Sequence, residues 1–155
     1  MIRIRLVWVG RTREPWLREG LEEYLRRLRP FARCEVVEVR EERSGEAVRR
    51  REKEGGRILS ALAPSVYTMA LDERGDALST RRFAEWLGRR ESAGERGAAF
   101  VLGGPEGLDP AVLGRAERLL SLSPMTLTHE MARLVLVEQL YRAFTILRGH
   151  PYHRD

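Results

Sequence analysis

"FVLGGPEGLDP", residues 100–110, is the stretch that decides how the chain is organised. The short apolar run 100–102 indicates a buried strand, which glycines at 103, 104 and 107 end at once. Asp109-Pro110 is typical of a helix start, with an N-cap residue followed by proline at the first helical position. The glycines have two interpretations: a tight turn, or a place where the backbone closely approaches a ligand.

Strand and helix patterns alternate along the whole chain. Strands are expected where aliphatic residues cluster between turn signals, over 2–9, 34–39, 66–71, 98–102 and 120–123. Helices are expected between Pro15 and Pro30, over 46–63, from Ser79 or Thr80, from Pro110 to about Leu120, and from the cap Thr128 to about Arg148. The alternation predicts an α/β protein with a mostly parallel sheet and helices on both faces, in one domain over 1–155.

The composition favours an anionic partner without proving one. The net charge is +5, and the only lysine is Lys53, so arginine supplies the rest of the cationic charge. Arginine suits phosphate and base contacts, although a genome rich in arginine codons gives the same composition. The single cysteine, Cys34, excludes a disulfide framework and a multi-cysteine metal site, and we expect no metal. No apolar run is long enough for a membrane span, so we expect a cytoplasmic protein.

A ligand site is expected beyond the carboxyl ends of the strands, as in other open α/β sheets. This rule selects residues 71–75, 103–107 and 123–128, which would lie side by side if their strands are neighbours. The turn after the first strand has one glycine, which excludes the dinucleotide fingerprint. A phosphate-binding loop and a hydrolase nucleophile elbow are also absent from the sequence.

The C-terminal part carries all three histidines. His129 falls in the first turn of the last helix, where a capping or packing role is the ordinary expectation. The ending "HPYHRD", residues 150–155, combines groups that can stack on a base and move a proton, although chain ends are usually frayed. The last helix is apolar nearly all round, which predicts burial on all sides and a homodimer through this helix.

"LGGPEGL", "LSLSPMTLTHEMARLVLVEQLYRAF" and "HPYHRD" together resemble one family over the whole chain. It is the bacterial methyltransferase family that modifies N3 of a pseudouridine in 23S rRNA, within the SPOUT superfamily. The resemblance implies S-adenosylmethionine as methyl donor, a C-terminal trefoil knot and a dimer. It implies donor binding by Leu71, Gly103, Gly104, Ser123, Pro124, Met125, Thr126, Leu127 and Thr128. It places Tyr152, His153 and Arg154 at the substrate side, where we expect them to be catalytic, with His153 either accepting the N3 proton or only orienting the base. Thr128 stands where the family often has proline, and threonine can cap the same helix.

Two other functions remain open. A non-enzymatic ribosome-binding factor would share the basic charge and the dimer, but it would not need a glycine-lined donor pocket. A knotted methyltransferase acting on tRNA would have the same donor site and differ only in its substrate. The target nucleotide and the general base are not identified by the sequence.

Overall fold

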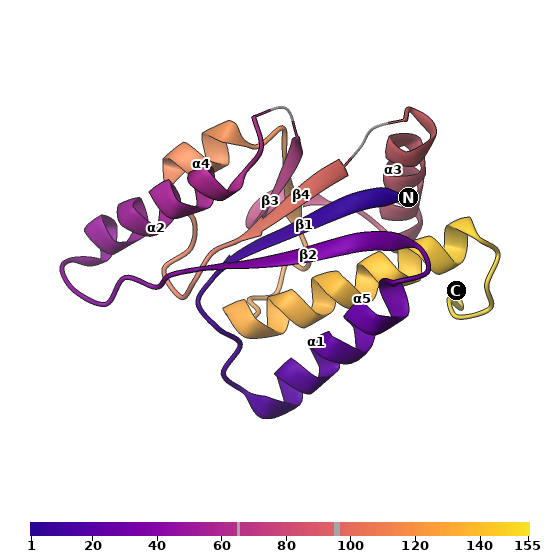
Figure 1. Cartoon of the computed structure of the whole chain (residues 1–155), viewed down its shortest axis with the longest axis horizontal. Coiled ribbons are helices and arrows are strands. Elements are labelled where there is room, and N and C mark those ends of the chain that lie inside the picture. The colour runs from indigo at the N-terminus through magenta and orange to yellow at the C-terminus, as the bar shows by residue number, and fades with distance from the viewer. Residues whose placement is uncertain (65, 95–96) are drawn as a thin grey trace.

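The structure is a computed structural model that describes residues 1–64, 66–94 and 97–155 (Figure 1). Strands and helices alternate as expected. The elements are β1 (Ile2–Val9), α1 (Pro15–Leu28), β2 (Ala32–Val39), α2 (Ala47–Ala61), β3 (Tyr67–Ala77), α3 (Thr80–Ser92), β4 (Gly97–Leu102), α4 (Pro110–Arg115), β5 (Arg118–Ser121) and α5 (His129–Leu147).

The five strands form one parallel sheet in the order β2-β1-β4-β3-β5. Helices α1, α3 and α5 cover one face, and α2 and α4 cover the other (Figure 1). Strand β1 explains this arrangement, because its side chains alternate between two apolar clusters. Ile4 and Leu6 are buried with α1, α3 and α5, whereas Val7 and Val9 are buried with α2 and α4. The predicted α/β class, with helices on both faces, is therefore confirmed.

The boundaries of α4 and β5 differ from the sequence expectation. Helix α4 begins as expected, with Asp109 accepting a hydrogen bond from the Ala111 amide, but it ends at Arg115 and not near Leu120. Strand β5 consequently covers 118–121 and not 120–123. Pairing with β3 decides this, because the Glu117 amide donates to the Thr68 carbonyl and Arg118 pairs with Met69. Pairing with β3 thus outweighs the helical pattern of residues 116–120.

Strand β3 is longer than expected and contains an irregularity. Its pairing with β5 shifts register between Leu71 and Asp76, so the expected loop 71–75 is a bulge within the strand. At Gly75 the backbone of β3 comes so close to β5 that a Cβ would lie 2.5 Å from the backbone carbon of Leu119. The bulge turns Leu71, Asp72 and Glu73 toward the end of β4.

Helix α5 lies between α1 and α3, and no residue in it is fully exposed. Phe144 stacks on Phe31, and Leu136 and Leu140 are completely buried within this chain. Most of the all-round apolar character therefore belongs to the packing of one chain, and our reason for expecting a second chain as cover was wrong for these residues. The strand order alone does not establish a trefoil knot, which stays a prediction.

Two further expectations concern solubility and the cysteine. Among the described residues, no helix has both the length and the apolar character needed to cross a bilayer. Cys34 lies in β2 and is half-buried, and this burial raises the pKa of its thiol to about 11.

Candidate functional site

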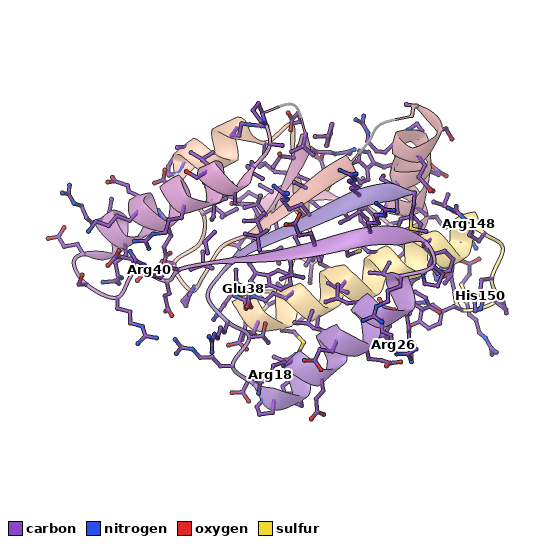
Figure 2. The ribbon with its side chains drawn as sticks, viewed as in Figure 1. Arg18, Arg26, Glu38, Arg40, Arg148 and His150 are labelled. Atoms are coloured by element: carbon purple, nitrogen blue, oxygen red, sulfur yellow. The ribbon has the colours of Figure 1, made fainter. Side chains whose placement is uncertain are left out.

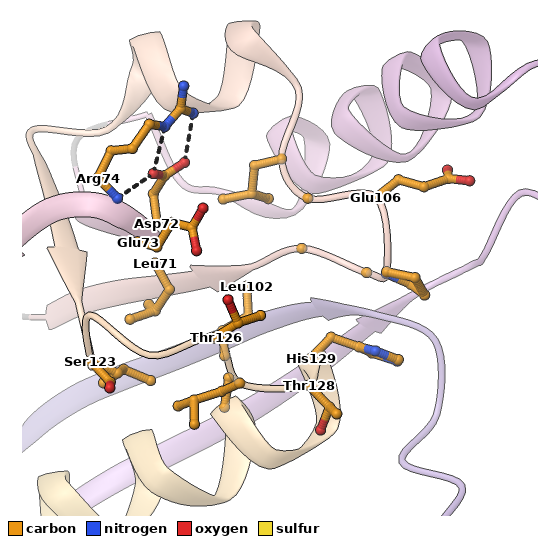
Figure 3. A pocket seen from close by; sticks show the side chains of 18 of the residues that line it. Leu71, Asp72, Glu73, Arg74, Leu102, Glu106, Ser123, Thr126, Thr128 and His129 are labelled. Atoms are coloured by element: carbon orange, nitrogen blue, oxygen red, sulfur yellow. Dashed lines mark hydrogen bonds and ion pairs between the residues drawn. The ribbon is translucent and has the colours of Figure 1, made fainter.

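A cavity of about 750 Å³ opens between the bulge of β3, the ends of β4 and β5 and the start of α5 (Figure 3). The three segments selected from the sequence meet there, although they lie far apart in the chain. Of the nine residues expected to bind a ligand, all but one line the cavity; Pro124 does not. The eight are Leu71, Gly103, Gly104, Ser123, Met125, Thr126, Leu127 and Thr128.

The glycine turn explains why β4 ends in residues almost without side chains. Gly104 and Gly107 form a β-bridge, and the Gly107 amide donates to the Gly104 carbonyl at 3.0 Å. A Cβ on Gly103 would lie 2.6 Å from the backbone carbon of Gly107, so the turn itself excludes a side chain there. A Cβ on Gly104 would meet Val9 at an ordinary 3.5 Å. Packing within the protein thus requires glycine at 103 but not at 104.

The loop before α5 is held by its own hydroxyl groups. The Ser123 hydroxyl accepts a hydrogen bond from the Met125 amide at 2.9 Å, and the Ser121 hydroxyl donates to the Ser123 carbonyl. Thr128 caps α5 as expected, because its hydroxyl accepts from the Met131 amide at 3.2 Å. These bonds leave the side chain of Met125 76% exposed at the cavity.

Charged side chains line the opposite wall of the cavity. Asp72 accepts hydrogen bonds from the Arg74 guanidinium and amide, and Glu106 is ion-paired with Arg50 of α2 (Figure 3 draws the Asp72 bonds). Both arginines lower the pKa of the carboxyl they contact, so these groups are anionic at neutral pH. Arg51 also lines the cavity, and its buried Nε has no hydrogen-bond partner. No pattern in the sequence pointed to Arg51, because α2 reaches the cavity only through tertiary packing.

His129 lines the same cavity from the first turn of α5 (Figure 3). Its pKa is lowered, first by burial and then by the positive charge of Arg133 one turn further along the helix. Glu130 and Glu41 act in the opposite direction, and Arg13 in the same direction as Arg133. The ordinary expectation of a capping or packing role missed that this imidazole faces the cavity. Thr128, and not His129, is the cap.

Arg133 is completely buried without a carboxylate in contact. Its guanidinium donates to the carbonyls of Val9 and Gly10 and to the Thr12 hydroxyl, and it lies 5.0 Å from the centre of the Trp8 ring. Glu130 accepts hydrogen bonds from the Arg13 and Glu14 amides at the start of α1. The first turns of α5 are thereby fixed to the end of β1.

The C-terminal residues do not line the cavity of their own chain. The His153 ring contacts the Arg142 guanidinium through Nδ1 at 3.1 Å and Asp155 through Nε2 at 3.1 Å. Tyr152 donates to Glu138 and shares a hydrogen bond with Tyr24, and burial together with these bonds raises the pKa of its hydroxyl. Arg142 is 13 residues beyond His129, about 20 Å along the helix. One chain thus keeps the two groups of expected site residues apart.

Known proteins resemble this chain over nearly its whole length. A family model described as "Predicted SPOUT methyltransferase" matches residues 2–153. "Ribosomal RNA large subunit methyltransferase H" of Solidesulfovibrio magneticus is 46% identical over 150 residues, which is 97% of each chain. The protein of the same name from Geobacter sp. (strain M21) is 41% identical over 99% of this chain and all of its own length.

Solved structures support the same fold at lower identity. A probable methyltransferase from Bordetella pertussis superposes with a TM-score of 0.57 at 20% identity, covering 92% of this chain and 96% of its own. The family model and the relatives support the resemblance noted in the sequence, and the solved structure supports the fold. The chain belongs to the SPOUT methyltransferase family.

Proposed function

We propose that this methyltransferase transfers the methyl group of S-adenosylmethionine to N3 of a pseudouridine in 23S rRNA, with residues 1–155 working as one domain. The observation that carries the proposal is the cavity formed by the bulge of β3 and the segments that follow β4 and β5. It occurs in a chain 41% and 46% identical to proteins named for methylating large-subunit ribosomal RNA. The net charge of +5 suits an RNA substrate. Arginines lie at both ends of the molecule, as Arg40 and Arg148 illustrate in Figure 2.

The cavity has the size and charge that the methyl donor requires. About 750 Å³ is within the usual range for a small-molecule site. Gly103 and Gly104 line the cavity with backbone alone, and the carboxylates of Asp72 and Glu106 lie at the same cavity as a sulfonium group would. In this proposal Leu71, Gly103, Gly104, Ser123 and residues 125–128 hold the donor. The donor supplies an activated methyl group, so the protein has to position the base and remove its N3 proton.

We propose that the enzyme works as a homodimer through α5, with the tail of each chain serving the partner's cavity. The cavity lies at the start of α5, whereas Tyr152 and His153 contact its second half. A two-fold axis crossing the middle of α5 exchanges the two halves of the helix. Each tail then lies beside the half of the partner's helix that carries the donor cavity. Met131 and Val135, which are part-exposed and outside both apolar clusters, supply a contact surface.

In this arrangement the tail binds and orients the RNA. Arg154 is exposed and has no ion pair among the described residues, so it is available to a phosphate. Tyr152 packs edge-on against Tyr141 at 4.7 Å between ring centres, which fixes an aromatic surface near the end of the chain. The two ring nitrogens of His153 contact Arg142 and Asp155 of the same chain. His153 is therefore better placed to hold the tail in shape than to accept a proton.

The proposal is tested with ribosomes from a strain that lacks this modification. The purified protein and S-adenosylmethionine labelled in the methyl group should give one methyl group per large subunit, at N3 of a single pseudouridine. Reverse transcription locates it, because N3 methylation blocks base pairing. Ribosomes that carry unmodified uridine at that position are the matched control and should incorporate much less label. Preferential labelling of tRNA would contradict the proposed substrate, and failure to bind the donor would favour a ribosome-binding factor.

A further inference from the structure

The proposed reaction needs a group that accepts the N3 proton, and most acidic groups at the cavity are unsuited to it. Asp72 and Glu106 are held by arginines that lower their pKa values, which makes both carboxylates weak bases. Glu73 is exposed on the bulge of β3. His153 lies outside the cavity of its own chain and contacts Arg142 and Asp155 through its two ring nitrogens.

His129 satisfies the requirements of position and charge state. It lines the cavity beside Thr128, in the same loop-helix junction that carries the expected donor-binding residues. Its side chain is 29% exposed, so a substrate can reach it. Its nearest carboxylate oxygen, Oε2 of Glu130, is 3.9 Å from Nε2, beyond a hydrogen bond. One imidazole nitrogen is therefore available as an acceptor when the ring is neutral.

The surroundings of His129 keep the ring neutral. Burial disfavours the charged ring most, and Arg133 and Arg13 repel a second positive charge, whereas Glu130 and Glu41 oppose these effects. The positive end of the α5 dipole acts in the same direction as the arginines. Arg133 cannot move away, because the carbonyls of Val9 and Gly10 hold it in the core. The net result is a pKa below the ordinary value, and a neutral imidazole is the form that can accept a proton.

Resting on the proposed function, we propose that His129 of the chain that binds the donor is the general base for methyl transfer. The imidazole nitrogen takes the N3 proton, and the N3 electron pair forms the bond to the methyl carbon. The carbon–sulfur bond breaks, and its electron pair stays on sulfur to give neutral S-adenosylhomocysteine. The charge of the sulfonium ends on the imidazolium, which then releases its proton to water.

The test is the pH dependence of a single turnover on modification-deficient ribosomes, at saturating donor. In the wild type the rate should fall as the pH decreases through the His129 pKa, below the ordinary value of about 6.5. His129→Asn keeps a polar side chain of similar size but cannot titrate. It should reduce the rate by roughly 10²–10⁴-fold, remove this acid limb and recover partly at high pH, where the base ionises unaided. Calorimetry should give a donor affinity within about threefold of the wild type, a shift of roughly 0.7 kcal/mol at most.

His153→Asn is the contrasting variant. It should raise the KM for ribosomes and keep both the acid limb and most of the turnover. An unchanged rate and pH profile for His129→Asn would overturn the proposal, as would loss of the acid limb in His153→Asn. A loss in His129→Asn that more donor restores would make His129 a donor-binding residue only. If His129→Asn and His129→Gln both fail to fold, a wild-type rate that stays flat down to pH about 5 overturns the proposal, and a limb supports it.

These outcomes separate the two proposals. A wild type that methylates no N3 position on the ribosome contradicts the proposed function itself. A wild type that methylates N3, together with an active His129→Asn, contradicts only the assignment of the base.

Discussion

At the scale of single residues, the two neighbouring glycines after β4 are present for different reasons. Gly103 lies so close to Gly107 that the turn has no space for a Cβ, whereas Gly104 has ordinary packing distance to Val9. The tight-turn interpretation of the opening motif is therefore supported at Gly103. The ligand interpretation stays a proposal that rests on Gly104, which lines the cavity through its backbone.

This difference predicts opposite effects of substitution. Gly103→Ala should destabilise the fold by roughly 1–3 kcal/mol, because the added carbon overpacks a backbone contact. Gly104→Val should weaken donor binding at least tenfold, because its branches press on Val9 and Glu54 and displace the turn that lines the cavity, whereas the free energy of unfolding should fall less than in Gly103→Ala. Urea denaturation and calorimetry with S-adenosylmethionine measure the two effects. Unchanged donor affinity in Gly104→Val would remove the glycine turn from the donor site.

The buried contacts of Arg133 allow its effect on the free energy of unfolding to be predicted. Arg133→Met keeps much of the packing against Trp8 but leaves the Val9 carbonyl without its donor at 2.6 Å and the Thr12 hydroxyl without its partner. Unsatisfied buried acceptors cost about 1–3 kcal/mol each, so the free energy of unfolding should fall by roughly 2–5 kcal/mol. Arg13→Met removes an exposed ion pair with Glu41 and should cost about 1 kcal/mol or less. Equal effects in urea denaturation would show that the buried contacts of Arg133 contribute little.

At the scale of elements, starts were easier to predict from the sequence than ends. Asp109 and Thr128 were predicted as N-caps of α4 and α5, because a cap depends only on residues within one turn. Both caps are confirmed. The end of α4 depends on β5 pairing with β3, and the bulge in β3 depends on the close approach of Gly75 to Leu119. Such contacts between distant segments leave no local pattern, so the sequence could not reveal them.

The same distinction applies to the site. The strand-end rule located the cavity because it depends only on which strands are parallel neighbours. The rule could not supply Arg51, which comes from α2. Nor could it place the tail, because the bond between Tyr24 and Tyr152 joins residues 128 positions apart. A tail that looked frayed in the sequence is held by Glu138 and Arg142 along α5.

The tail, as an element, gives a prediction of its own. Deleting residues 150–155 should leave donor affinity within about threefold, a shift of roughly 0.7 kcal/mol at most, because these residues do not line the cavity of their chain. Methyl transfer to ribosomes should be lost, since the groups proposed to orient the RNA are gone. Calorimetry and labelled methyl transfer measure the two properties. The proposed role of the tail would be wrong if the shortened protein kept full activity on ribosomes.

At the scale of the whole molecule, the position of α5 changes how a dimer should be tested. The core of one chain already buries Leu140 completely, so a charge at that position would disrupt the monomer itself. Met131 and Val135 are only part-buried and belong to neither apolar cluster. They mark the side of α5 that a partner could cover without rearranging the chain.

Val135→Glu is therefore the variant that tests assembly. In a single chain the carboxylate can reach water from a half-exposed helical position, so the fold should persist with a loss of about 1 kcal/mol or less. In the proposed dimer the two-fold axis brings the substituted positions of both helices toward one interface, where an unpaired charge costs several kcal/mol. Light scattering should give a dimeric wild type and a monomeric variant. The monomer should transfer no methyl group, because the partner's tail is missing. Lys53→Glu places a new negative charge on exposed α2, remote from α5, and should stay dimeric. A wild type that scatters as a monomer while methylating ribosomes would contradict the shared site, and the tail would then have to reach the cavity of its own chain.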